Sequence, residues 1–186
     1  FLSVPGKNVK DSVYSRIKEK YPTATGPLIV HRLDMSTSGI LLLTKTKEAN
    51  TILQSQFINR TIKKRYVALL DGILNENKGT IQLPLRVDLY DRPKQLVDFK
   101  YGKNAETTWE IIAKENGKTR VYFYPVTGRT HQLRVHAAHK NGLNTPILGD
   151  DLYGKKTNRL HLHAEKIEFT HPSTNKKMSF RVAPAF

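Results

Sequence analysis

The strongest constraint on the fold is a hairpin signal centred on Asn116-Gly117. Apolar and polar residues alternate on both sides of this dipeptide, over 107–113 and 120–126. Such alternation predicts two strands that each bury one face. Asn-Gly favours the tight turn in which both central residues take positive φ, and that turn joins antiparallel strands. The chain is therefore predicted to contain an antiparallel sheet.

Three segments have helical patterns. Asp11 or Ser12 can cap a helix that Pro22 ends, and apolar residues with helical spacing indicate a second helix over 49–57. A third helix is expected over 133–140. Asn141-Gly142 follows it, and we expect Gly142 to take the left-handed conformation that often closes a helix.

The other patterned segments are strand-like. Pro84 interrupts one of them and predicts a break there, and residues 88–94 are the best loop candidate. Because strands and helices do not alternate regularly, we expect an α+β fold with a mostly antiparallel mixed sheet and flanking helices. The strands are expected at 28–30, 40–44, 65–70, 80–87, 160–164, 167–169 and 178–182.

Length and charge restrict the class of protein. The 186 residues are enough for a single domain, residues 1–186, with a full core. Lys and Arg number 31 against 16 Asp and Glu, a formal charge of +15 that favours a polyanionic partner such as nucleic acid. No apolar run reaches the roughly 20 residues needed to cross a bilayer, and cysteine is absent. We expect a cytoplasmic protein without a membrane partner.

Two distant segments contain the main candidates for chemistry. Residues 31–39 read His-Arg-Leu-Asp-Met-Ser-Thr-Ser-Gly, so Asp34 stands in a polar turn before an apolar run, and residues 127–136 include Arg129 and Arg134. A functional carboxylate needs a cation nearby to remain ionised, and a guanidinium supplies two fixed donors. The simpler interpretation is that Asp34 makes an ordinary turn and that the arginines lie on an exposed basic face.

Other polar residues allow more than one interpretation. Tyr66 follows the basic run 63–65 and could stack on an unpaired base, or it could be a core tyrosine. Two pairs of histidines could share a face and bind zinc, but no cysteine or suitably spaced carboxylate joins them, so we expect no metal site. A Gly-rich phosphate loop is also missing, so no nucleotide cofactor is expected. The histidine pairs are His136 with His139 and His161 with His163.

Several motifs in order resemble those of the RluA-type pseudouridine synthases. The His31-Arg32-Leu33-Asp34 run with Thr37-Ser38-Gly39 resembles the family's aspartate signature, and residues 128–136 resemble its arginine motif. Residues 64–68 are similar to the tyrosine motif. The segments 148–150, 153–154 and 162–164 follow in the family's order, so the resemblance covers nearly the whole chain.

The resemblance implies RNA uridine isomerisation with base flipping and no metal or organic cofactor. Asp34 would be the catalytic acid, Tyr66 would stack on the flipped base and take its C5 proton, and Arg134 would pair with Asp34. The implied partner is a stem-loop of ribosomal or transfer RNA. The sequence does not reveal the oligomeric state, and a monomer is our expectation. The implied substrate-binding residues are Arg32, Arg129, His131, Gln132 and Leu162.

The chain also departs from the family pattern. It begins at Phe1 after the family's usual first strand, which we expect to be missing, and it contains no S4-type RNA-binding domain. Residues 92–95 and 102–107 resemble the branch that modifies both transfer and ribosomal RNA. A non-catalytic RNA-binding or ribosome-assembly module of the same fold is the main alternative, and a metal-dependent nuclease ranks below it.

Overall fold

The computed structural model describes residues 2–6 and 9–186. It divides into two compact units. The first unit comprises the chain up to Lys64 together with Ala164–Ala183, and the second comprises Arg65–His163 with Pro184–Phe186. The expectation of a single domain stays a prediction. The expected missing strand would precede Phe1, outside the described residues, and also stays a prediction.

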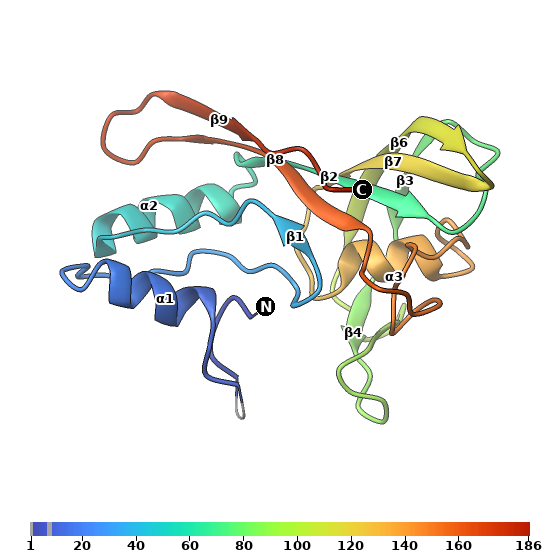
Figure 1. Cartoon of the computed structure of the whole chain (residues 1–186), viewed down its shortest axis with the longest axis horizontal. Helices are drawn as coiled ribbons and strands as arrows, with labels where there is room; N and C mark the ends of the chain where they lie inside the picture. The colour runs from blue at the N-terminus through green and yellow to red at the C-terminus, as the bar shows by residue number, and fades with distance from the viewer. Residues whose placement is uncertain (1, 7–8) are drawn as a thin grey trace. The chain divides into compact units, whose positions relative to one another are not determined.

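The second unit is built on antiparallel strands, shown in Figure 1. Strand β2 (Lys63–Leu70) pairs with β7 (Lys118–Pro125), β7 pairs with β6 (Glu106–Glu115), and β6 pairs with β3 (Lys78–Gln82). The predicted hairpin is confirmed: Asn116 and Gly117 connect β6 to β7 with φ values of 50° and 74°. Both residues thus take the positive φ that this tight turn requires.

Helix α3 (Gln132–Ala138) packs on one face of these strands. Leu133 and Ala137, four residues apart and therefore on one helix face, join the buried cluster that contains Leu70, Val121 and Phe123. The sheet supplies alternate residues to this cluster, since Val121 and Phe123 are buried while their neighbours Tyr122 and Tyr124 are only half-buried. The core of the unit therefore lies between the helix and the sheet.

The end of α3 differs from the prediction. The helix ends at Ala138, and His139 is already extended, with φ −67° and ψ 141°. Gly142 does not take a positive φ; Asn144 does, at 50°. Gly142 is needed for another reason, because a Cβ there would lie 2.0 Å from the carbonyl oxygen of His136. Close backbone approach, rather than left-handed geometry, explains this glycine.

A second hairpin leaves the unit beyond β3. It consists of β4 (Leu85–Val87) and β5 (Gln95–Val97), which pair antiparallel with each other. The predicted break at Pro84 is confirmed, because this residue separates β3 from β4. The predicted loop over 88–94 is also confirmed, since it connects the two strands of the hairpin.

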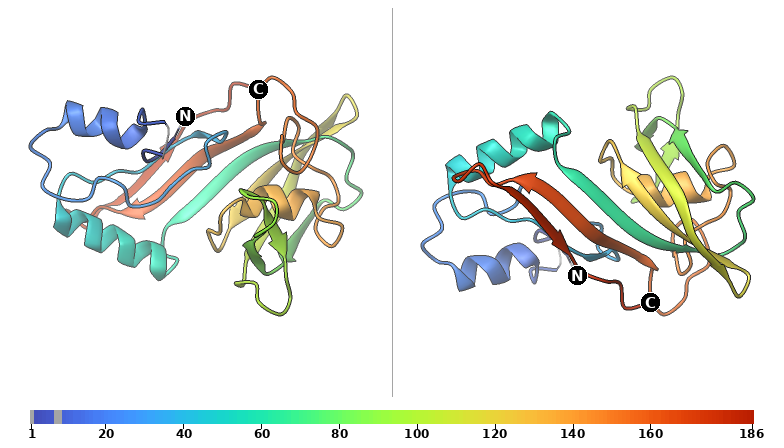
Figure 2. Two further views of the ribbon diagram at one scale, coloured as in Figure 1. Left: turned by 90° about the horizontal axis from the view of Figure 1, so that it is seen from below. Right: turned by 90° about the horizontal axis from the view of Figure 1, so that it is seen from above.

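The described residues of the first unit form the helices α1 and α2. Helix α1 (Val13–Lys20) begins at Ser12 with a reciprocal capping box to Ser15, which confirms the predicted start. Helix α2 (Lys47–Ile58) begins after Thr46 and covers the hairpin of β8 (Leu162–Thr170) and β9 (Lys177–Arg181), as Figure 2 shows. The amide of Gln56 fixes this contact through hydrogen bonds of 2.8 and 2.9 Å to the backbone of Thr170.

Two predicted strands of this unit are wrong. Residues 28–30 and 40–44 contain only an isolated antiparallel bridge between Ile29 and Leu43, and the strand is β1 (Ser38–Gly39). The reason is that this segment changes partner along its length: Ile40 N donates to Ala164 O, whereas Thr44 N donates to Leu28 O. No single ladder is long enough to make a regular strand.

The predicted fold class is confirmed, because the described residues form a mixed α+β structure whose named strand pairs are antiparallel. The predicted strands over 160–164 and 167–169 merge into the single strand β8. Within the described part of the chain, no helix has both the length and the apolar composition that a membrane span requires.

Candidate active site

Asp34 lies in a short turn of the first unit. Its carbonyl oxygen accepts a hydrogen bond of 3.0 Å from Thr37 N, as the turn interpretation predicted, and its side chain is half-buried. The residue before it is clamped by Ser3, whose hydroxyl donates to Leu33 O at 3.0 Å and accepts from Leu33 N at 3.2 Å. The backbone that carries the carboxylate is thus fixed on both sides.

Gly39 ends this turn and joins it to β8. Its φ is 113°, and a Cβ there would lie 2.3 Å from the carbonyl oxygen of Ala164. Only glycine combines this backbone conformation with such close contact. The turn that holds Asp34 is therefore anchored by backbone contact as well as by the Ser3 hydroxyl.

His31 and Lys64 lie beside the start of the turn. The Nε2 atom of His31 accepts a hydrogen bond of 2.9 Å from Leu42 N, and its ring centroid is 4.9 Å from that of Phe57. Burial, with a smaller contribution from the charge of Lys64, lowers the pKa of His31 to about 4. Burial also lowers the pKa of Lys64. His31 is therefore neutral at physiological pH.

Arg134 is the centre of a buried ion pair in the second unit. Its guanidinium binds both oxygens of Asp150, with distances of 2.9 Å from Nε to Oδ2 and 2.6 Å from Nη2 to Oδ1, and it also contacts Asp151 at 2.9 Å. Arg134 is 3% exposed and Asp150 is fully buried. This two-point geometry is the strongest form of an arginine–carboxylate contact.

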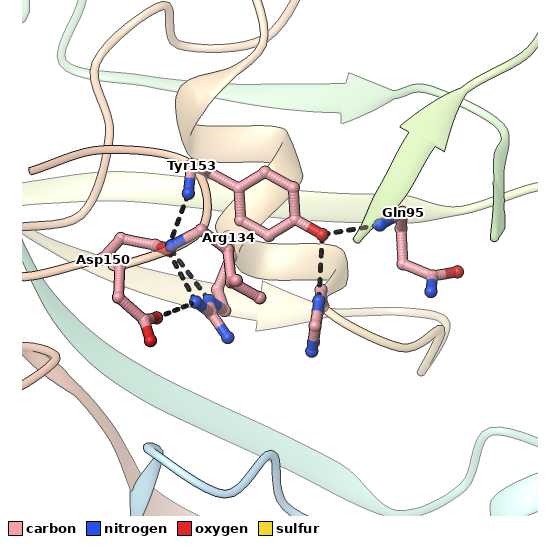
Figure 3. A network of polar contacts seen from close by, with 7 residues as sticks. Gln95, Arg134, Asp150 and Tyr153 are labelled. Carbon is pink, nitrogen blue, oxygen red and sulfur yellow. Dashed lines mark hydrogen bonds and ion pairs between the residues drawn. The ribbon is translucent and has the colours of Figure 1, made fainter. Parts of the chain in front are cut away.

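The same carboxylate organises the loop that follows it. Oδ1 of Asp150 accepts hydrogen bonds of 3.0 Å from the backbone N–H groups of Leu152 and Tyr153. The Tyr153 hydroxyl then accepts from Gln95 N at 2.7 Å, as Figure 3 shows. It also contacts His131 Nδ1 at 2.9 Å. One network therefore connects α3, the loop after it and β5.

Gln132 and Arg129 precede Arg134 in the same segment. The Gln132 carbonyl oxygen accepts from Thr127 Oγ1 and from Arg129 N, while its NH2 group donates to Glu106 O and Thr107 Oγ1, at 2.7 to 3.0 Å. All four hydrogen-bonding positions of this buried amide are thus used inside the protein. Arg129 is exposed, and its Nε donates to Asn104 O.

The remaining predicted residues occupy different surroundings. His131 is 9% exposed and has a left-handed backbone at φ 52°, where it begins α3. Tyr66 is a half-buried residue of β2 that packs against the main cluster of the second unit, and Leu162 is a buried member of that cluster. Arg32 is exposed in the first unit. Tyr66 thus packs against the core without being buried in it, and its role toward RNA stays a prediction.

Two of the histidines that were considered as metal ligands contact polar groups of the protein. His136 is fully buried between Thr107 Oγ1 and Leu83 O, and burial lowers its pKa to about 4. His161 Nδ1 contacts the carbonyl oxygens of Leu148 and Arg159. Over residues 2–6 and 9–186, no group of three or more potential metal-ligating side chains occurs.

Sequence reasoning missed the partners of Arg134. Asp150 and Tyr153 stand in motifs that the resemblance noted without assigning a role, and nothing local in the sequence pairs them with a residue 16 or more positions earlier. Asp34 belongs to the first unit and Arg134 to the second, so their predicted pairing stays a prediction.

Comparisons with known proteins identify the family. A model of the RNA pseudouridylate synthase family matches residues 2–139. The chain is 45% identical over 193 residues to the dual-specificity RNA pseudouridine synthase RluA of Pasteurella multocida, covering all of this chain and 85% of that protein. It is 44% identical to the protein of the same name from Escherichia coli K12, covering 99% and 84%.

Solved structures agree with the sequence comparisons. The fold matches human RNA Pseudouridylate Synthase Domain Containing 1 with a TM-score of 0.78 and 27% identity, over 94% of this chain and 75% of that one. It also matches human RNA Pseudouridylate Synthase Domain Containing 4 with a TM-score of 0.77. The identity of 23% supports the fold alone. The chain belongs to the RNA pseudouridylate synthase family.

Proposed function

We propose that this chain converts uridine to pseudouridine in structured RNA and that the Asp34 carboxylate is its catalytic group. The observation that carries the proposal is the identity of 45% to a named RNA pseudouridine synthase over the full length of the chain. The local structure of Asp34 supports it, because Ser3 and Gly39 fix the backbone of a turn whose acidic side chain is only half-buried. Fixed geometry of this kind favours catalysis.

The reaction exchanges one bond of the nucleotide for another. The bond between N1 of uracil and C1′ of ribose breaks, the ring turns, and a bond from C5 to C1′ forms. The proton on C5 leaves and N1 gains a proton, so the composition of the nucleotide is unchanged. Asp34 would act on the flipped uridine at C1′ or by elimination to a glycal, and Tyr66 would stack on the base and accept the C5 proton. A carboxylate serves here as nucleophile or base only when ionised, a state that an arginine partner favours. The family resemblance assigns this partner role to Arg134.

RNA binding follows from charge and from the exposed cations. A net charge of +15 favours phosphate contacts, which supply affinity without regard to sequence. We assign direct RNA contacts to Arg32 and Arg129, which are exposed, and contact with the flipped base to Leu162 and His131. Gln132 would act on the substrate by holding Arg129 and the start of α3, since its own amide is fully bonded.

The proposed substrates are stem-loops of ribosomal and transfer RNA. Two lines of support exist: the relatives are named as dual-specificity enzymes, and residues 92–95 and 102–107 resemble the branch that acts on both RNA types. Because RNA enzymes that flip a base recognise loop shape together with a few unstacked bases, unpaired uridines are the expected targets.

Tritium release from RNA labelled at C5 of uridine tests the function. Wild-type protein should release tritium from ribosomal or transfer RNA, and mapping of the product should place pseudouridine at defined loop positions. The Asp34→Asn variant should lose release by a factor of at least about 1,000, while Asp71→Asn, an exposed aspartate of the second unit, should behave as wild type.

The outcomes separate the two candidate functions. Salt-dependent RNA binding by the wild type with no tritium release from total RNA would support the non-catalytic module and reject the enzyme. Release by Asp34→Asn at the wild-type rate would reject the catalytic role of this aspartate while leaving the activity in place.

A further inference from the structure

The loop that contains Asp34 connects two segments, at 28–29 and 43–44, that form an interrupted antiparallel pair. Thr44 N donates to Leu28 O at 2.9 Å, and Ile29 faces Leu43 in an isolated bridge. In an antiparallel ladder with this register, the next hydrogen bond toward the loop would run from Leu42 N to the backbone of residue 30. Leu42 N instead donates to the Nε2 atom of His31 at 2.9 Å. A side chain thus takes the place of a backbone acceptor.

This substitution occurs where the chain changes partner. Ile40 N donates to Ala164 O on β8, and Thr44 N donates to Leu28 O on the other side. Leu42 N lies midway between these two donors along the chain, in a part-buried position where an unpaired N–H is costly. The imidazole therefore connects residue 31, at the start of the Asp34 loop, to residue 42, at its end.

The imidazole can accept this bond only while it is neutral, because a protonated ring has no free nitrogen lone pair. Two side chains from neighbouring elements face it. Phe57 of α2 contacts its ring, and the positive charge of Lys64 of β2 acts on it. Both surroundings, apolar contact and like charge, favour the neutral form.

We propose that His31 is a positioning residue for the isomerisation, which holds the two ends of the Asp34 loop together through the Leu42 N–H. The inference rests on the proposed function, since it assumes that Asp34 performs the chemistry. His31 does not touch the uridine in this account. It acts by keeping the Asp34 backbone in the geometry that the reaction needs.

Two substitutions separate the hydrogen bond from the ring packing. His31→Phe keeps an aromatic ring against Phe57 but removes the acceptor, whereas His31→Gln places an amide oxygen near the position of Nε2. In tritium release at neutral pH, His31→Phe should lower kcat by about 10- to 100-fold with little change in KM, because a small displacement of a catalytic group has this effect. His31→Gln should recover most of the loss.

The pH profile of kcat separates a positioning role from a purely structural one, because a purely structural residue would not shift this profile. Removing the charge with Lys64→Met should let His31 bind a proton more easily, so the acid side of the kcat profile should shift to higher pH. The same change made in the His31→Gln background should leave that side of the profile unmoved. If His31→Phe does not fold, this comparison alone decides the proposal.

The chain offers a matched control in the same unit. His171 Nδ1 also accepts backbone N–H groups, those of Ser173 at 3.3 Å and Thr174 at 3.2 Å, in the turn between β8 and β9. His171→Phe removes a comparable acceptor far along the chain from Asp34 and should leave kcat unchanged. Thermal unfolding and RNA affinity are measured for every variant.

Failure of the inference differs from failure of the function. Tritium release by the wild type together with full release by folded His31→Phe overturns the positioning role alone. The positioning role is also overturned if Lys64→Met shifts the acid side of the kcat profile to the same extent in the His31→Gln background. If the wild type releases no tritium from any RNA, the proposed function fails and the positioning role fails with it.

Discussion

Two aspartates of this protein have opposite surroundings. Asp150 is fully buried, and its two oxygens accept hydrogen bonds from the Arg134 guanidinium and from two backbone N–H groups. Asp34 is half-buried on a turn whose backbone is held by neighbouring residues such as Ser3 and His31. A carboxylate that is fully bonded inside the protein stabilises the fold. A carboxylate on a fixed backbone with an accessible side chain is suited to chemistry.

The largest expected effect on stability comes from Asp150. Asp150→Ala leaves Arg134 buried without its main partner, and breaking a buried pair in this way costs about 3 to 5 kcal/mol of unfolding free energy. The adjacent Asp151→Ala removes a contact with an aspartate side chain that is 45% exposed. It should lower the unfolding free energy by about 1 kcal/mol or less. Urea unfolding measures both. Equal losses of unfolding free energy would contradict the view that Asp150, and not the more exposed Asp151, is the main partner of Arg134.

Mild acid should destabilise both units through one histidine each. The pKa values of His31 and His136 are lowered from 6.5 to about 4 by burial, so the unfolded chain binds protons that the folded chain does not. The stabilisation is complete above pH 6.5 and is lost as pH falls toward 4, by about 3 kcal/mol for each residue. Urea unfolding across this range measures the loss. His31→Gln and His136→Gln should each flatten the dependence, and an unchanged slope in both would contradict the assignment.

The anchor of the Asp34 turn can be tested at Gly39. Gly39→Ala combines an unfavourable φ of 113° with a Cβ at 2.3 Å from Ala164 O. The substitution should lower the unfolding free energy by about 1 to 3 kcal/mol and should also lower kcat. Gly117→Ala is the matched control, because its φ of 74° is also positive but its Cβ would meet open space. It should cost about 1 kcal/mol and leave kcat unchanged. Equal effects on tritium release would show that the turn is not positioned by this contact.

A smaller effect than that of Asp150→Ala is expected at the hydroxyl of Tyr153. Tyr153→Phe removes the contacts with Gln95 N and His131 Nδ1 but keeps the ring over the Arg134 guanidinium, 5.3 Å away. The expected cost is about 1 to 2 kcal/mol of unfolding free energy. Thermal unfolding measures this change. A loss as large as that of Asp150→Ala would mean that the hydroxyl, rather than the ion pair, holds the network together.

Sequence reasoning succeeded where structure is decided locally. The Asn116-Gly117 hairpin, the Ser12 cap and the break at Pro84 follow from the chemistry of one or two residues, and all three are confirmed. It failed at 40–44, where the partner of each backbone N–H is distant in sequence and changes within five residues.

The site shows the same division. The Asp34 turn was predictable from its Ser, Thr and Gly residues, but the clamp by Ser3 joins positions 30 residues apart. Arg134 was selected as a candidate for carboxylate pairing, and its pairing with Asp150 and Asp151 depends on how the loop after α3 folds back onto the helix. The resemblance placed the motifs in order without revealing these contacts.

The most direct test compares turnover with stability in the Asp34→Asn protein itself. Both tritium release from RNA labelled at C5 of uridine and the unfolding midpoint are measured on one preparation. We predict no detectable release together with a midpoint within about 2 °C of the wild type, because the carboxylate performs chemistry and the backbone holds the turn. Retained release at an unchanged midpoint would contradict the central claim that this acid is the catalytic group.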